Sequence, residues 1–173
     1  MVEIRKVISG GQTGVDRALL DVAKEMYIEY GGWCPHGGLA EDSPHPPGIL
    51  KYYPKLTETP SSNPRERTEW NVRDSDATLI VLMDEGNSLL SSSGTAYTKE
   101  IAIKYKRPFL VTSLKNKFLP TIIYKWLTKT DHSIILNVAG SRESESPGIY
   151  KKTKKLLTTL FFEIMTNNPK RYG

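Results

Sequence analysis

The sequence has few of the features that would place it outside the cell or in a membrane. Its 173 residues include one cysteine, Cys34, which excludes an intramolecular disulfide and agrees with a reducing compartment. No segment reaches the ~20 apolar residues of a transmembrane helix. The N-terminus shows neither the apolar stretch nor the small-residue cleavage site of a secretory signal. We therefore expect a cytoplasmic protein without a membrane partner.

Two nucleotide-binding motifs are also missing. The glycine-rich segment at residues 9–14 is not closed by the Gly-Lys-Ser/Thr of a P-loop, and it lacks the Gly-x-Gly-x-x-Gly spacing of dinucleotide-binding proteins. The sequence thus gives no support to ATP hydrolysis or hydride transfer. Cys34, His36 and His45 lack further ligands at metal-binding spacing, so we predict no metal site. No nucleophile has a recognisable setting, and no catalytic residue is assigned.

The positive charge of the chain is not arranged like a nucleic-acid surface. The net charge is +5 at pH 7. Much of the excess lies near the C-terminus, at Lys151, Lys152, Lys154, Lys155, Lys170 and Arg171. On a helix, residues 151–155 form a solvated basic face. We expect no nucleic-acid partner.

Strands alternate with helices along the chain. Apolar runs typical of buried strands lie at residues 4–8, 77–83, 109–112 and 133–138, with a shorter candidate at 27–33. Helical patterns lie at residues 16–26, 64–74, 96–105, 120–128 and 147–165. A glycine- and proline-rich loop at residues 34–54 is long enough to be functional or mobile. The order predicts an α/β fold: a single Rossmann-like domain over residues 1–173, with a mainly parallel sheet and helices on both faces.

Three loops that follow strands and open helices have residues suited to anions. They are residues 9–14, 91–95 and 139–146. Glycines allow close approach to the backbone, and a helix N-terminus offers N–H groups and positive potential. The loops supply the candidate ligand-binding residues Gly10, Gly11, Gln12, Thr13, Gly14, Gly94, Thr95, Ser141 and Arg142. Because ligands bind beyond the carboxyl ends of parallel strands, we expect one shared pocket for a small phosphorylated ligand.

Other candidates lie outside these loops. Arg67 and Asn71 share a helical face by their spacing of four, and either reach a ligand or remain at the surface. Asp16 lies in the first turn of a helix, where it complements the helix dipole. Trp33 and Cys34 follow a candidate strand, and the thiol either contacts a ligand or packs as an ordinary buried cysteine.

Several motifs together resemble a known family. They are SGGQTGVDR (9–17), GWCP (32–35), AED (40–42), RTEWNVRDSDAT (67–78) and NVAGSRES (137–144). In this order they resemble the molybdenum cofactor carrier family, the circularly permuted YpsA-like branch of the SLOG or lysine-decarboxylase-like Rossmann superfamily. That superfamily also includes the cytokinin-activating phosphoribohydrolases. The resemblance spans residues 7 to about 148.

The resemblance implies a homo-oligomer, with a tetramer suspected, that binds molybdenum cofactor (molybdopterin) by its phosphate and pterin. Such a protein stores and protects the cofactor and delivers it to molybdoenzymes without catalysis. The phosphate cradle is then Gly10 to Gly14, with the other two loops nearby. The full set of cofactor-binding candidates is Gly10, Gly11, Gln12, Thr13, Gly14, Trp33, Cys34, Arg67, Asn71, Gly94, Thr95, Thr98, Ser141 and Arg142.

The chain departs from its relatives at two places. Residues 34–38 read Cys-Pro-His-Gly-Gly where the family often has a basic Cys-Pro-Lys-Gly-Arg, so this loop has less positive charge. Thr98 stands where phosphoribohydrolases carry a glutamate. A nucleotide-processing, phosphoribohydrolase-like enzyme would need another acid, such as Asp84, Glu85 or Glu100. That enzyme and a nucleotide-sensing module are the alternatives to a carrier.

Overall fold

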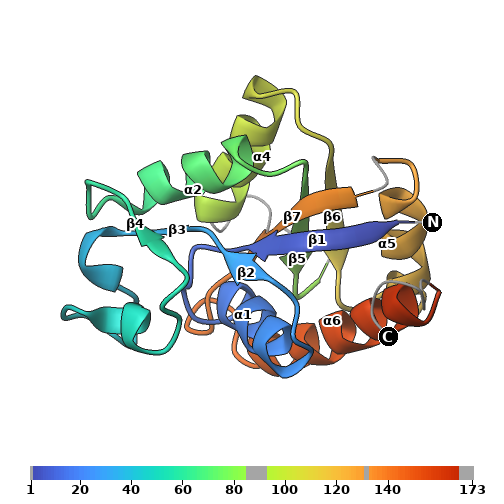
Figure 1. The fold of residues 1–173 in the computed structure, drawn as a ribbon, viewed down its shortest axis with the longest axis horizontal. Coiled ribbons are helices and arrows are strands. Elements are labelled where there is room, and N and C mark those ends of the chain that lie inside the picture. Colours follow the sequence, from blue (N-terminus) through green and yellow to red (C-terminus); the bar gives the residue numbers. More distant parts are fainter. Residues whose placement is uncertain (1, 85–92, 131–132, 168–173) are drawn as a thin grey trace.

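A parallel five-stranded sheet forms the centre of the computed structural model, which describes residues 2–84, 93–130 and 133–167 (Figure 1). The strand order is β2-β1-β7-β5-β6, and every pairing is parallel. The strands are β1 (Glu3–Ile8), β2 (Tyr30–Gly31), β5 (Ala77–Leu82), β6 (Phe109–Ser113) and β7 (Ser133–Gly140). Every residue of β5 is buried, as expected for a strand covered on both faces.

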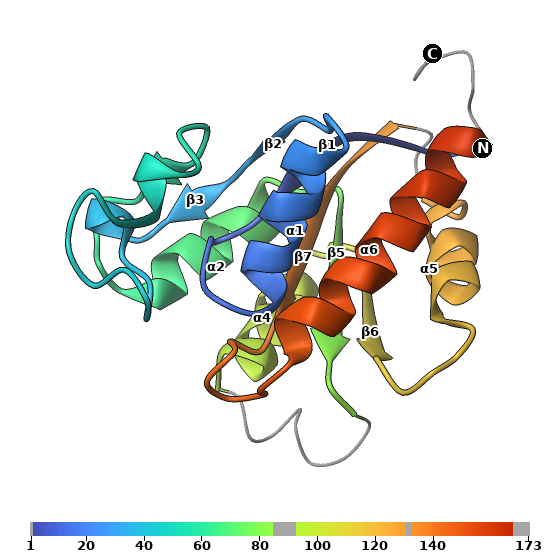
Figure 2. The same cartoon turned by 90° about the horizontal axis from the view of Figure 1, so that it is seen from below.

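Helices cover both faces of the sheet (Figures 1 and 2). On one face α1 packs against α6, with α5 beside α6, and on the other face α2 packs against α4. The helices are α1 (Val15–Glu25), α2 (Pro64–Arg73), α4 (Ser93–Lys104), α5 (Leu119–Leu127) and α6 (Ile149–Thr166). The apolar stripes of α1 and α6 close the main core, where Leu19, Leu157 and Phe161 are fully buried. The predicted α/β class is confirmed.

The strand order creates a topological switch point at one edge of the sheet. β7, the last strand among the described residues, lies between β1 and β5. Moving β7 and α6 to the front of the chain would turn the order into 3-2-1-4-5, that of a nucleotide-binding Rossmann sheet. The helix after β7 lies on one face, whereas α4, the next described helix after β5, lies on the other (Figure 1). The carboxyl ends of β7 and β5 therefore form the switch point where such sheets bind ligands.

The predicted single strand at residues 27–33 is wrong. The structure divides it at Gly32 into β2 and β3 (Trp33–Cys34), and β3 pairs with β4 (Thr57–Glu58) in a separate two-stranded sheet. Gly32 has φ 119°, and a Cβ there would lie 2.4 Å from the carbonyl oxygen of Ser9. Only glycine accepts this backbone conformation and this close contact, so Gly32 permits the chain to leave the main sheet here.

The other differences are smaller. The loop at residues 34–54 contains two short 3-10 helices, His36–Gly38 and Gly48–Lys51. β7 continues to Gly140, so the first two residues of the predicted third loop belong to the strand. Residues 91 and 92 of the predicted second loop lie outside the described residues. Within the described ranges, no helix combines the length and apolar character needed to cross a membrane.

Candidate functional site

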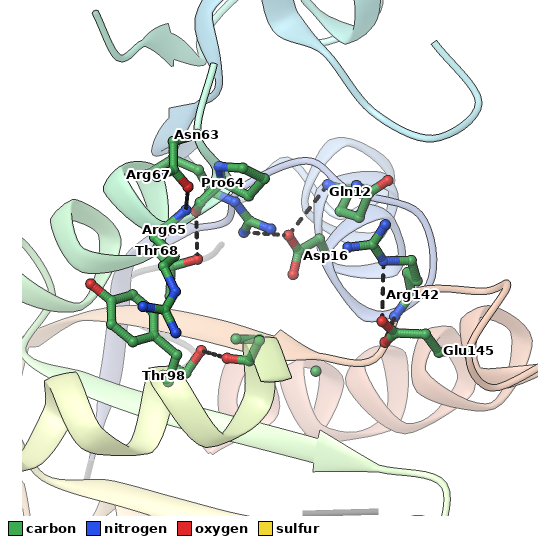
Figure 3. Close-up of a pocket in the computed structure, with 14 residues that line it drawn as sticks. Gln12, Asp16, Asn63, Pro64, Arg65, Arg67, Thr68, Thr98, Arg142 and Glu145 are labelled. Carbon is green, nitrogen blue, oxygen red and sulfur yellow. Dashed lines mark hydrogen bonds and ion pairs between the residues drawn. The ribbon is translucent and has the colours of Figure 1, made fainter. Parts of the chain in front are cut away.

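A cavity of about 250 Å³ lies at the carboxyl end of β7 (Figure 3). Four parts of the chain build it: the glycine-rich loop with the first turn of α1, the start of α2, α4, and the end of β7 with the loop that follows. The lining residues are Gln12, Asp16, Asn63, Pro64, Arg65, Arg67, Thr68, Gly94, Tyr97, Thr98, Ala139, Gly140, Arg142 and Glu145. The predicted meeting of loops at one sheet edge is confirmed for the first and third loops, through Gln12 and Arg142. Residues 93–95 of the predicted second loop instead belong to the first turn of α4, which contributes Gly94.

A buried ion pair lies in the wall of this cavity. Nη1 of Arg67 is 3.0 Å from Oδ2 of Asp16, and the two side chains are 16% and 5% exposed. Burial raises the pKa of Asp16, and the charge of Arg67 opposes but does not cancel this rise. Asp16 therefore does more than complement the dipole of α1, because it also holds Arg67 against the glycine-rich loop (Figure 3).

Local structure on both sides positions this pair. α2 starts with Pro64 in its first turn, and Oδ1 of Asn63 caps the helix by accepting the N–H of Arg65 at 3.0 Å. The guanidinium of Arg67 lies directly on Gly10, where a Cβ would be 1.8 Å from Nη1. A side chain at position 10 would thus displace Arg67.

Hydrogen bonds within the protein occupy backbone N–H groups of the glycine-rich loop. The N–H of Gly11 donates to Oγ of Ser9 at 3.2 Å, and the N–H of Gln12 donates to Oδ2 of Asp16 at 3.3 Å. The N–H of Thr13 donates to Oε1 of Gln12 at 3.0 Å. A backbone phosphate cradle needs N–H groups that face the ligand. An anion that uses these three N–H groups must therefore replace their present partners.

Three arginines from two elements supply positive charge to the cavity. Arg65 lies over the ring of Tyr97, with its Cζ 4.5 Å from the ring centroid. Nε of Arg142 is 3.4 Å from Oε1 of Glu145 (Figure 3). With Arg67, these arginines face two lining carboxylates, Asp16 and Glu145, which leaves one positive charge in the lining. Such a lining favours an anionic group, which arginine recognises with paired hydrogen bonds.

A second cavity of about 240 Å³ adjoins the first. Its lining residues are Gly10, Gln12, Pro35, Leu39, Ala40, Pro44, Ser62, Pro64 and Arg67. Gln12, Pro64 and Arg67 line both cavities, so the two form halves of one cleft on either side of Arg67. The second half is walled mostly by prolines and aliphatic side chains, which can pack against the faces of a flat ring.

The structure brings some of the predicted site residues together in this cleft. They are Gly10, Gln12, Arg67, Gly94, Thr98 and Arg142. Thr13 and Gly14 instead line a different cavity, together with Arg17 and Asp21.

Three further predicted residues lie behind the cleft. Gly11 faces Ile49, whose Cδ1 would be 2.1 Å from a Cβ at this position. Ser141 supports the glycine-rich loop, because its carbonyl oxygen accepts the N–H of Val15 at 3.3 Å. Thr95 is buried in the first turn of α4 and is not among the residues that line either half of the cleft.

Trp33, Cys34 and Asn71 lie outside the lining of both halves. The side-chain amide of Asn71 bonds the backbone N–H and carbonyl of Trp33 at 2.7 and 2.9 Å, which joins α2 to β3. The indole N–H of Trp33 donates to Asp74 at 2.8 Å. Cys34 is fully buried, and burial together with the charge of Glu58 raises the pKa of its thiol to about 11. In this placement, the three residues stabilise the fold through contacts within the protein.

The carboxylates considered for a nucleotide-processing enzyme lie elsewhere. Asp84 pairs with Lys115 at 3.7 Å, and Glu100 is exposed on α4. Neither is among the residues that line the cleft, and Glu85 is outside the described residues. In the described part of the chain, no group of three or more His, Cys, Asp or Glu side chains is arranged to hold a metal ion.

The residues of the cleft that the sequence analysis did not single out as binding candidates include Asn63, Arg65, Tyr97 and Glu145. A signal was present for Arg65, because Asn-Pro at positions 63 and 64 marks a helix start and Arg65 follows directly, two residues before Arg67. Tyr97 and Glu145 are recognisable only from the packing of α4 and the third loop against the other walls.

Comparison with known proteins gives two findings. Residues 7–161 match the model of the circularly permutated YpsA SLOG family. The chain is also similar to a crystal structure, at 1.45 Å resolution, of a protein from Syntrophus aciditrophicus SB named "Putative molybdenum carrier protein". The identity is 40% and the TM-score 0.81, over 92% of this chain and 96% of that one. No curated protein matches the chain.

Proposed function

The chain belongs to the circularly permutated YpsA SLOG family, and from this membership and the geometry of its cleft we propose that it is a carrier of molybdenum cofactor. It binds this phosphorylated pterin without chemical change, stores and protects it, and delivers it to molybdoenzymes. The name of the similar S. aciditrophicus protein supports this choice of ligand. We further propose that the carrier is a cytoplasmic homo-oligomer, with a tetramer as the expected form.

The observation that carries the proposal is the division of the cleft at Arg67. One half presents the three arginines Arg65, Arg67 and Arg142, and the other half has mostly apolar walls. A phosphorylated pterin has a matching division, with an anionic group at one end and a flat ring system at the other. In this arrangement the arginines bind the phosphate, and Pro35, Leu39 and Pro44 contact the ring.

A nucleotide-processing enzyme is the second candidate. A nucleoside monophosphate has the same two chemical parts, and Glu145 supplies a carboxylate in the half of the cleft that holds the arginines. A carboxylate near a bound nucleotide can serve as an acid or base in hydrolysis. This alternative predicts turnover of nucleoside monophosphates, which the carrier does not perform.

The first test is purification without oxygen from cells that make molybdenum cofactor. The denatured supernatant is oxidised and assayed for pterin fluorescence, and molybdenum is measured in parallel. We expect stoichiometric pterin with the wild-type protein. Absence of pterin together with turnover of nucleoside monophosphates would favour the enzyme.

A matched pair of variants tests the cleft itself. Arg65→Ala removes an exposed arginine from the cleft, and Arg73→Ala removes an arginine from the same helix that pairs with Asp74 outside it. A lost hydrogen bond to a charged group costs about 1.5–3 kcal/mol. We therefore expect bound pterin to fall at least about tenfold in Arg65→Ala and to persist in Arg73→Ala. Equal retention in both variants would contradict this placement of the phosphate.

A further inference from the structure

The carboxylate of Glu41 lies between two of the predicted anion-binding loops and accepts hydrogen bonds from both. Its Oε1 accepts from the hydroxyl of Thr13 and from the N–H of Ser144 at 3.3 Å. Its Oε2 accepts from the hydroxyl of Ser144 at 2.5 Å and lies 3.8 Å from Nη1 of Arg142. An anionic group of this chain thus occupies donors that converge from residues 9–14 and 139–146.

These donors are arranged for an anion. The hydroxyl of Thr13 accepts the N–H of Glu143 at 3.1 Å, so its own proton points to Glu41. Partial burial alone would raise the pKa of Glu41. The hydrogen bonds from Ser144 and Thr13, with the charge of Arg142, outweigh burial and lower the pKa instead. The surroundings therefore favour the charged form of the group they hold.

We propose that Thr13, Ser144 and Arg142 form an anion subsite next to the cleft, on the side of Arg142, that Glu41 occupies it in the free protein, and that a phosphate group displaces this carboxylate on binding. The inference rests on the proposed function for the presence of a phosphorylated ligand. A phosphate monoester brings more negative charge and more acceptor oxygens than a carboxylate, so the same donors bind it more strongly. Arg142 also lines the arginine-containing half of the cleft, which connects the subsite to it.

The turn that carries Glu41 is anchored independently of its carboxylate. Ala40 and Ser43 exchange backbone hydrogen bonds of 3.1 and 2.9 Å. Asp42 binds the guanidinium of Arg17 through both carboxylate oxygens, at 2.9 and 3.0 Å. The Glu41 side chain can therefore rotate out of the subsite while the turn stays in place. For the same reason, substitutions of Glu41 are expected to preserve the fold.

Calorimetric titration with inorganic phosphate tests the subsite. Glu41→Gln and Glu41→Ala remove the competing charge, whereas Asp42→Asn removes a charge from the adjacent residue of the same turn and leaves Glu41 in place. We expect the affinity for phosphate to rise about tenfold in both Glu41 variants, within the usual range of coupling between ligands. The affinity of Asp42→Asn should stay within about twofold of the wild type, because asparagine keeps a side-chain oxygen that accepts from Arg17 and Asp42 contacts none of the three donors of the subsite.

Three outcomes would overturn the subsite: weaker or unchanged phosphate binding in the Glu41 variants, an equal gain in Asp42→Asn, or no phosphate binding by any of these proteins. Because the probe is inorganic phosphate, the result is independent of the pterin assay. Phosphate binding that depends on Glu41 in a protein that retains no pterin would support the subsite and reject the carrier. Bound pterin together with unchanged phosphate affinity in the Glu41 variants would support the carrier and reject the subsite.

Discussion

The contact between Gly10 and Arg67 gives a quantitative test of the cleft. Gly10 does not have a positive φ, so its backbone accepts alanine, and the obstacle is the guanidinium 1.8 Å from the new Cβ. In Gly10→Ala this guanidinium must move, which lengthens its 3.0 Å contact with buried Asp16. Overpacking costs about 1–3 kcal/mol, and removing one partner of a buried pair costs about 3–5 kcal/mol. We expect Gly10→Ala to lower the free energy of unfolding by about 2–3 kcal/mol.

A double-mutant cycle shows whether the loss of stability comes from the contact between Gly10 and Arg67. Arg67→Ala removes the obstacle, so adding Gly10→Ala to it should change the free energy of unfolding by no more than about 1 kcal/mol. The assay is urea unfolding followed by circular dichroism and by fluorescence of the three tryptophans. Small domains typically have about 5–15 kcal/mol of stability, so the variants should still fold. Additive losses from the two substitutions would refute the placement of Arg67 on Gly10.

Three shorter predictions concern residues outside this contact. Cys34, with its buried thiol and a pKa raised to about 11, should react with a thiol reagent at pH 8 only after unfolding, and rapid labelling of the folded protein would contradict its burial. Asn71→Ala should cost about 2–4 kcal/mol in urea unfolding, because the N–H and carbonyl of Trp33 lose their partner, while phosphate affinity measured by calorimetry stays unchanged. Glu41→Gln should lower the urea midpoint by a constant amount from pH 8 to pH 5. The folded pKa of Glu41 lies below its unfolded value of about 4.3, so the difference in urea midpoint between variant and wild type should disappear only as pH falls through that lower pKa. Loss of this difference at a higher pH would argue against the contacts of Glu41.

Most of the fold follows from local patterns in the sequence. The run Ala77–Leu82 is apolar at nearly every position and forms the fully buried β5, and the spacing of apolar residues in α1 gives its core-facing stripe. The error at residues 27–33 has a tertiary cause. The chain turns at position 32, and only glycine fits there because Ser9 and Asn71, distant in sequence, occupy the space a side chain would need. A pattern read along one segment does not contain that information.

The site was predictable in its location but only partly in its chemistry. Strand and loop order are sufficient to bring Gln12, Gly94 and Arg142 to one edge of the sheet. The apolar half of the cleft depends on how residues 34–54 fold back over the glycine-rich loop, and the two 3-10 helices in that segment have no clear periodic signal. The contacts of Glu41 also depend on the tertiary structure, because its partners Thr13 and Ser144 lie far from it in the sequence, one on each side.

The internal hydrogen bonds of the glycine-rich loop bear on how the cleft recognises an anion. A backbone cradle binds through fixed N–H groups, and its strength does not depend on particular side chains. Here the N–H groups of Gly11 and Gln12 stabilise the loop itself, through Ser9 and Asp16. The positive charge that attracts an anion then comes from arginines on α2 and in the loop after β7, so the affinity for the anion depends on these side chains. In the proposed role the protein must also release its ligand, and binding through side chains that already have internal partners, as Arg67 has in Asp16 and Arg142 in Glu145, would make that release easier.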